Sequence, residues 1–112
     1  MKAQTKIIFF DENNVKFFGE GPARLLHAIE KHGSLRTAAL SMNMAYTKAL
    51  KIIKNAENTL GFPLTTRTTG GKTGGGSQLT PKGKEWLIRY ETYRDACIQA
   101  NQQLYLEFFS EQ

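Results

Sequence analysis

The chain has 112 residues, a formal net charge of +5 and 40% hydrophobic residues. This length fits one domain over residues 1–112 and is too short for a second domain of ordinary size. No apolar run reaches the roughly 18 residues that a membrane span needs, and the first residues lack the apolar core of a secretion signal. We therefore expect a cytoplasmic protein without a membrane contact.

The positive charge is concentrated in the middle of the chain. Residues 21–60 carry six Lys and Arg against two acids, and residues 61–89 carry five against one. Residues 1–20 are balanced, whereas residues 90–112 have a net charge of −3. A basic region attracts polyanions such as nucleic acid, although many small proteins are basic for solubility alone.

Residues 1–20 predict a β-hairpin. Two β-rich runs, residues 6–10 and 15–19, flank the turn-forming residues 11–14, Asp-Glu-Asn-Asn. Both runs contain doubled aromatics, so one face is expected to pack on a helical core. The other face either packs in the core as well or meets a partner or a second copy.

Residues 22–61 predict a first helix followed by a helix-turn-helix. Pro22 suits the first turn, and the apolar Leu25, Leu26 and Ile29 share one face before Gly33 ends the helix. Ser34 can cap the second helix, whose inward stripe is Leu35, Ala38, Ala39 and Met42.

The third helix presents one apolar and one cationic face. Asn43 precedes it at the position where this motif turns through a left-handed residue. Its expected inward face is Ala45, Ala49, Ile52, Ile53, Ala56 and Leu60. On the outward face, the expected contacts to base edges are Tyr46, Thr47 and Lys48, and the expected contacts to phosphates are Lys51 and Lys54.

Two further regions are expected to contact the DNA backbone. Arg36 and Thr37 begin the second helix, where backbone amides and a cation can hold a phosphate. Residues 62–80 predict a hairpin with a glycine-rich tip, the wing, with cationic or polar contacts from Arg67, Lys72 and Thr73. Thr66 occupies the place of the first glycine of a phosphate-binding loop, which argues against a nucleotide site. A disordered linker is the alternative for this stretch.

Residues 81–109 predict a long C-terminal helix, capped by Thr80 and opened by Pro81. Such a helix is about 40 Å long, more than a domain of this size covers. We therefore expect a homodimer, with an intramolecular fold-back as the alternative. The expected dimer interface is Trp86, Tyr90, Tyr93, Cys97, Leu104 and Phe108.

The sequence predicts no catalytic, cofactor or metal site. His27 and His32 have no acidic or cysteine companion at ligand spacing, and Cys97 fits an apolar helical stripe. No nucleophile with a base and no pair of carboxylates occurs at a usable spacing. We expect a protein that is not an enzyme.

Short runs from Gly33 to Thr80 carry a family resemblance: Gly33-Ser34, Ala38-Ala39, residues 44–49, Glu57, residues 60–64, the glycines on both sides of Lys72, and Leu79-Thr80. Together they resemble the N-terminal DNA-binding domain of ModE-type molybdate-responsive regulators. The glycines around Lys72 are the most specific part, because LysR-type regulators share the helix-turn-helix half. The resemblance implies a dimeric winged-helix transcription factor that binds double-stranded DNA.

Two departures from the family limit what the resemblance implies. Ala45 stands where a capping serine is common, so no hydroxyl contact is expected there. The chain ends at Gln112, and we expect a stand-alone domain without the oxyanion-binding portion and without molybdate binding. The alternative function is a structural dimer module of the same fold that does not read DNA.

Overall fold

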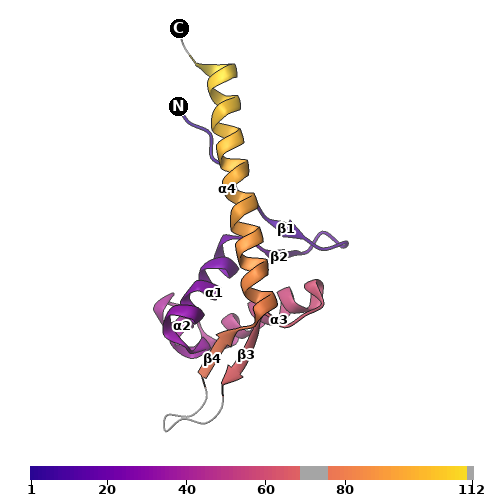
Figure 1. The fold of residues 1–112 in the computed structure, drawn as a ribbon, viewed down its shortest axis with the longest axis vertical. Helices are drawn as coiled ribbons and strands as arrows, with labels where there is room; N and C mark the ends of the chain where they lie inside the picture. The colour runs from indigo at the N-terminus through magenta and orange to yellow at the C-terminus, as the bar shows by residue number, and fades with distance from the viewer. Residues whose placement is uncertain (69–75, 111–112) are drawn as a thin grey trace.

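A computed structural model describes residues 1–68 and 76–110 of the chain (Figure 1). It confirms the mainly helical fold with two small hairpins and a long last helix. The elements in chain order are β1 (Phe9–Phe10), β2 (Lys16–Phe18), α1 (Glu20–His32), α2 (Leu35–Ser41), α3 (Tyr46–Leu60), β3 (Thr65–Thr68), β4 (Gly76–Leu79) and α4 (Pro81–Phe109). Each hairpin is a separate antiparallel two-stranded sheet.

Local signals in the sequence set the ends of the first two helices. α1 ends where Gly33 adopts a left-handed conformation with φ 69°, and its N–H donates to Ile29 O at 2.8 Å. α2 begins at the predicted cap, because Ser34 Oγ accepts a hydrogen bond from Thr37 N at 3.1 Å. Asn43 has φ 53°, so the predicted left-handed turn between α2 and α3 is confirmed.

One apolar core joins all four helices and both hairpins. Ala38 and Ala39 of α2 are buried and lack the bulk that would keep α1 and α3 apart. The expected inward position of Ala45 is wrong, since this residue precedes α3 as its cap and is exposed. The buried apolar residues are Phe18, Ala23, Leu25, Leu26, Ile29, Leu35, Ala38, Ala39, Ala49, Ile53, Ala56, Leu64, Leu79, Leu87 and Tyr90.

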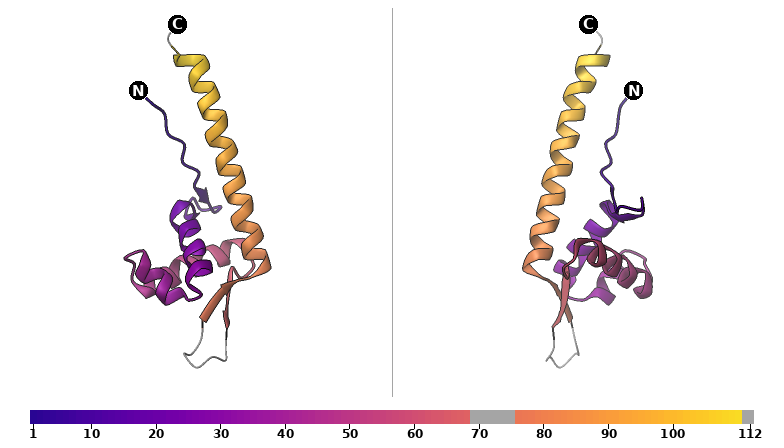
Figure 2. Two further views of the ribbon diagram at one scale, coloured as in Figure 1. Left: turned by 60° about the vertical axis from the view of Figure 1, so that its left-hand side comes forward. Right: turned by 90° about the vertical axis from the view of Figure 1, so that its right-hand side faces the viewer.

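The N-terminal hairpin is shorter than the sequence predicts. Its turn forms as expected, with the Asp11 carboxylate accepting hydrogen bonds from Asn13 N and Val15 N and with Asn14 at φ 62°. Strand pairing in β1 covers only Phe9 and Phe10, so residues 6–8, expected in the strand, have no strand partner in the described part of the chain. Figure 2 shows residues 1–8 as an extended segment that runs beside α4.

α4 contributes its first half to the core and leaves its second half outside it. The molecule is 64 Å long because α4, with 29 residues, rises from the base of the wing well past α1 (Figure 1). Tyr90 is 1% exposed, and Trp86 packs against Phe9 and Phe18. The expectation that Tyr90 faces a partner is therefore wrong, because its side chain fills this chain's own core. Trp86 packs against the same core but is only partly buried, so its place in an interface stays a prediction. No described helix is long and apolar enough to span a bilayer.

Burial also changes the chemistry of the Tyr90 hydroxyl. It donates to Ile7 O at 2.9 Å, which ties α4 to the N-terminal segment. Burial raises the pKa of Tyr90, and the neighbouring Glu20 carboxylate raises it further. Both effects favour the neutral hydroxyl, which is the form that donates the hydrogen bond.

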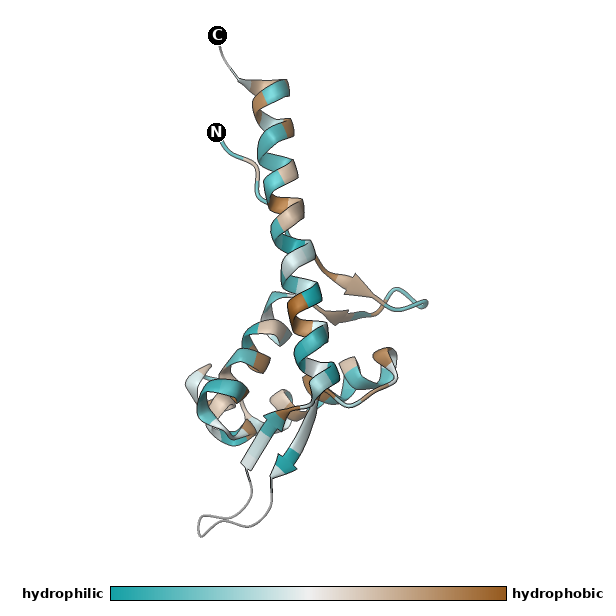
Figure 3. Cartoon of the chain, in the orientation of Figure 1, coloured by the Kyte–Doolittle hydropathy of each residue, from teal (hydrophilic) through white to brown (hydrophobic). Residues whose placement is uncertain are grey.

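Six large apolar side chains of α4 are exposed: Ile88, Tyr93, Leu104, Leu106, Phe108 and Phe109. Tyr93, Leu104 and Phe108, which the sequence places in a dimer interface, are more than half exposed, and Leu106 is exposed on another side of the helix. Figure 3 shows hydrophobic bands that continue to the free end of α4. The second half of α4 thus has an apolar surface that the described part of the chain leaves largely uncovered.

We predict that Gly83→Ala lowers the free energy of unfolding by about 2 kcal/mol, because overpacking against rigid groups costs this much. A Cβ at Gly83 would lie 2.3 Å from Leu64 O. The control is Gly21→Ala in α1, where a Cβ meets nothing within 4 Å. This change should add about 0.5–1 kcal/mol of stability, because alanine favours a helix. Urea unfolding measures both, and a Gly83→Ala protein as stable as the control would contradict the prediction.

Candidate nucleic-acid interface

The turn between α2 and α3 is held by backbone hydrogen bonds. Met42 N and Met44 N both donate to Ala39 O, at 3.0 and 2.9 Å, and Asn43 N donates to Leu40 O at 3.1 Å. Ala45 caps α3 without a side-chain hydrogen bond, because alanine has no hydroxyl at this position, where serine is common. The angle between the helices is therefore set by main-chain bonds and by alanine packing, and it fixes the direction in which α3 points.

The cationic face of α3 is exposed. Thr47, Lys48, Lys51 and Lys54 all lie at the surface, while Ala49, Ile53 and Ala56 on the other side of the helix are buried. The amphipathic pattern predicts this arrangement. Three ammonium groups within seven residues of one helix make this face strongly positive.

Tyr46 is placed differently from its neighbours. Its side chain is only partly exposed and packs on the core, and the Arg36 guanidinium lies 4.4 Å from the centre of its ring. A cation over an aromatic face is held there by the ring quadrupole. Arg36 of α2 and Tyr46 of α3 thus form one unit that spans the turn, which the sequence reading treated as two separate contacts.

The start of α2 has fewer free backbone N–H groups for binding an anion than the sequence predicts. Arg36 and Thr37 are both exposed, as expected, but Thr37 N already donates to Ser34 Oγ. The backbone amide of Thr37 is therefore committed to the helix cap, and the cation of Arg36 is the stronger attraction that remains.

The wing is anchored to α1 next to the helix-turn-helix. Ser77 N donates to Gly33 O at 2.8 Å, and a Cβ on Gly76 would lie 2.6 Å from the same carbonyl oxygen. Arg67 of β3 is exposed and pairs across the sheet with Ser77. The expected contacts Lys72 and Thr73 lie outside the described residues.

Glu57 links the end of α3 to the start of the wing, a role that helical periodicity does not reveal. Its Oε2 accepts a hydrogen bond from Leu64 N at 2.8 Å, and its Oε1 lies 4.0 Å from Lys54 Nζ. The Glu57 side chain is 16% exposed, so this hydrogen bond is largely shielded from water. It keeps α3 and the wing at a set distance from each other.

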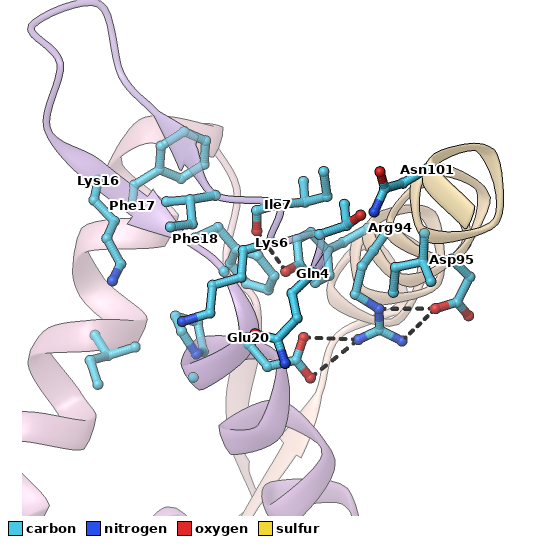
Figure 4. A pocket seen from close by; sticks show the side chains of 18 of the residues that line it. Gln4, Lys6, Ile7, Lys16, Phe17, Phe18, Glu20, Arg94, Asp95 and Asn101 are labelled. Atoms are coloured by element: carbon cyan, nitrogen blue, oxygen red, sulfur yellow. Dashed lines mark hydrogen bonds and ion pairs between the residues drawn. The ribbon is translucent and has the colours of Figure 1, made fainter. Parts of the chain in front are cut away.

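An open groove of about 1020 Å³ borders α3 on the side of the N-terminal segment. Lys48, Ile52 and Asn55 of α3 line one end of it, and Figure 4 shows the Lys6 and Lys16 side chains directed over it. Its floor contains Arg94, whose Nη1 lies 3.1 Å from Glu20 Oε2. Burial disfavours the charge of Arg94, but hydrogen bonds to Asp95 and Glu20 outweigh this effect and raise its pKa. Because Arg94 pairs with the two carboxylates Glu20 and Asp95, these three residues carry a net charge of −1, and the positive charge of the groove lies at its rim.

The histidines form no metal site with the residues that the structure describes. His27 Nε2 lies 2.8 Å from Glu91 Oε2, which joins α1 to α4. The described ranges contain no group of three or more His, Cys, Asp or Glu side chains that could hold a metal ion. His27 therefore acts as a surface contact between helices.

The helix-turn-helix, the hairpin that follows it and the close packing of both on α1 define a winged helix-turn-helix domain. Residues 23–84 match the family described as bacterial regulatory helix-turn-helix proteins of the lysR family. The chain belongs to this family. A crystal structure of the BenM DNA-binding domain in complex with benA site 1 DNA has the same fold, with a TM-score of 0.51 and 21% identity. The match covers 75% of this chain and 92% of that one.

Curated relatives confirm the ModE resemblance. The molybdenum transport protein ModE of Azotobacter vinelandii is 40% identical over 67 residues, which are 60% of this chain and 25% of that protein. The transcriptional regulator ModE of Haemophilus influenzae is 35% identical over 68 residues, 61% of this chain and 27% of that protein. The molybdenum-pterin-binding protein MopB of Rhodobacter capsulatus is 38% identical over 66 residues, 59% of this chain and 24% of that protein. The chain thus matches about a quarter of the length of each relative.

We predict that Glu57→Ala lowers the free energy of unfolding by about 1.5–2 kcal/mol, because it leaves Leu64 N without its charged acceptor. Glu57→Gln keeps an acceptor oxygen and should cost about half as much. Urea unfolding of the two variants provides the measurement. Equal losses in both would show that the hydrogen bond to Leu64 contributes nothing beyond the carboxylate charge.

Proposed function

We propose that this chain is a transcriptional regulator that binds double-stranded DNA as a homodimer in the cytoplasm. The observation that carries the proposal is the exposed cationic face of α3, located directly after the turn of a helix-turn-helix. In such domains the second helix enters the major groove with its N-terminal residues toward the bases. Membership in a family of regulatory helix-turn-helix proteins supports the same function.

Within α3, exposure and position suggest separate roles. Lys48 can donate to guanine acceptors, and Thr47 can donate or pack on a thymine methyl group. Lys51 and Lys54 lie further along the exposed face, where they would meet phosphates. Tyr46 is half-buried under Arg36, so its role is to orient that guanidinium toward the backbone and to offer its hydroxyl.

The wing and α2 would contact the DNA on either side of the major groove that α3 enters. Arg67 of β3 would contact the sugar-phosphate backbone, together with Lys72 and Thr73 of the glycine-rich tip. Arg36 would do the same at the start of α2, with Thr37 beside it. These contacts position the domain on the duplex without reading sequence.

The homodimer would form through the uncovered part of α4. Tyr93, Leu104 and Phe108 are exposed, and Cys97 lies between them on the helix and is partly buried. A two-fold dimer would place two α3 helices on successive turns of DNA and so recognise a near-palindromic site. The proposal includes neither catalysis nor a cofactor, and the expected lack of molybdate binding stays a prediction.

We predict that Lys48→Ala and Arg67→Ala weaken DNA binding in different ways. Lys48→Ala should cost about 1–3 kcal/mol on the preferred site and relax base preference there. Arg67→Ala should weaken binding to all duplexes alike and lower the slope of log K against log salt by about 1. Selection of bound fragments from a genomic pool identifies the site, and fluorescence anisotropy at several salt concentrations gives both quantities.

The control for this experiment is Lys2→Ala, which removes the same charge far from α3. Met1 next to it contacts Tyr105 in the second half of α4, so the change should leave DNA binding unaltered. Equal losses for Lys48→Ala and Lys2→Ala would contradict recognition through α3. Absence of any duplex binding at low salt would leave the structural dimer module as the function.

We predict that Leu104→Asp converts the dimer into a monomer, because it places a charge in the proposed apolar interface. Leu106→Asp is the matched control, since Leu106 is 62% exposed against 52% for Leu104 but lies on another side of α4. It should leave the dimer intact. Sedimentation velocity at several protein concentrations distinguishes the two, and dimers of equal strength would contradict this interface.

A further inference from the structure

The N-terminal segment, residues 1–8, contacts α4 through backbone oxygens of odd-numbered residues. Tyr90 donates its hydroxyl to Ile7 O at 2.9 Å, and Tyr105 donates its hydroxyl to Met1 O at 2.8 Å. Asn101 Nδ2 approaches Ala3 O more loosely, at 3.5 Å. Three donors along one side of α4 therefore hold the segment against the helix.

The same odd-numbered pattern continues into the hairpin. Phe9 pairs with Phe18 of β2, and Asp11 N donates to Val15 O at 2.8 Å. In an extended chain the N–H and C=O groups of alternate residues point to opposite edges. The odd-numbered groups thus face α4 and β2, and the even-numbered groups face away from both.

The even-numbered edge is free in the described part of the chain. None of the backbone N–H groups of Lys2, Gln4, Lys6 and Ile8 donates a hydrogen bond there. In both views of Figure 2 the segment lies beside α4 on one side and faces outward on the other. A free edge of this kind is a template for pairing with another strand.

Two exposed apolar side chains lie at the end of this even-numbered edge. Ile8 is 37% exposed and Phe10 is 54% exposed, although both continue a run of apolar residues. Surface apolar groups next to unpaired backbone are characteristic of an interface that lacks its partner. The backbone edge and its side chains therefore point to the same kind of occupant, an additional strand.

We propose that the N-terminal segment pairs antiparallel with the same segment of a second copy of this chain. Two identical strands related by a two-fold axis satisfy each other's free groups, which is strand addition between equal partners. This inference rests on the homodimer of the proposed function and adds a second contact to it. The two contacts adjoin, because Tyr93 of the exposed α4 surface stacks on Phe9 with 6.1 Å between ring centres.

The charges of the segment select the register. Pairing with Thr5 opposite Thr5 directs the free even-numbered groups toward each other and places Gln4 opposite Lys6 and Lys2 opposite Ile8. A register with Lys6 opposite Lys6 would bring like charges face to face and is disfavoured. The segment can therefore pair with itself without a lysine facing a lysine.

Hydrogen exchange of single amides tests the pairing. In the dimer, the amides of Gln4, Lys6 and Ile8 should exchange at least tenfold more slowly than those of Ala3, Thr5 and Ile7. This difference should disappear on dilution to monomer. Rapid exchange of the even-numbered amides in a protein shown to be dimeric would overturn the proposal.

Proline substitution removes one donor at a time. Gln4→Pro deletes an N–H of the free edge, whereas Ala3→Pro deletes one that faces α4 and donates no hydrogen bond among the described residues. Gln4→Pro should raise the dimer dissociation constant about tenfold, and Ala3→Pro should leave it nearly unchanged. Equal dissociation constants for the two variants would count against strand pairing.

A cysteine at the two-fold axis tests the register. In a Cys97→Ser background, Thr5→Cys should form a disulfide between chains, because opposed residues of a non-hydrogen-bonded pair have Cα atoms about 4.5 Å apart. Lys2→Cys is the control, since its two copies would lie about 20 Å apart. Crosslinking of both, or of Lys2→Cys alone, would reject this register.

The two contacts of the dimer can be separated by their variants. If Leu104→Asp yields a monomer and Gln4→Pro leaves the dimer dissociation constant unchanged, strand pairing fails while the α4 interface stands. If Gln4→Pro raises the dissociation constant about tenfold and Leu104→Asp leaves it unchanged, the strand is the interface and the proposed role of α4 fails. A weaker dimer in both variants supports both contacts.

Discussion

Leu64 is the residue that holds α3, the wing and α4 together. Its side chain is fully buried, its N–H donates to Glu57 of α3, and its C=O accepts from Thr80 N at 3.0 Å. The first turn of α4 lies directly against the same carbonyl, so Gly83 has no room for a side chain. Three elements therefore meet on one backbone unit, and none of them can shift without breaking a bond or a contact there.

This junction explains how a domain with little strand structure can hold a nucleic-acid surface in place. α3 is fixed at its start by the turn and the alanine packing of α2, and at its end by Glu57. The wing is fixed to α1 through Gly33 and to α4 through Thr80. Preorganised cations contact a fixed array of phosphates at a lower entropic cost than mobile ones.

The cationic surface and the apolar surface of the molecule lie at opposite ends, because the residues that form them come from different parts of the sequence. Cationic residues cluster between residues 21 and 89, a stretch that contains α1, α2, α3, the strands of the wing and the start of α4, at one end of the molecule. Aromatic and apolar residues of the N-terminal segment and α4 gather at the other end, where Tyr90 joins the two. A dimer formed there leaves both basic surfaces free, so association and DNA binding do not compete for the same residues.

The sequence alone determined the helices, their caps and the cationic face of α3, since periodicity, Ser34, Asn43 and the lysine spacing act over a few residues. Only the tertiary structure decided which apolar side chains of α4 are buried, because Tyr90 shares a helical stripe with Tyr93 and differs from it in what packs on it. It also decided the stacking of Arg36 on Tyr46, the bond from Glu57 to Leu64 and the free edge of the N-terminal segment. Each of these depends on groups distant along the chain or separated by a turn, and local pattern contains no information on how such groups meet.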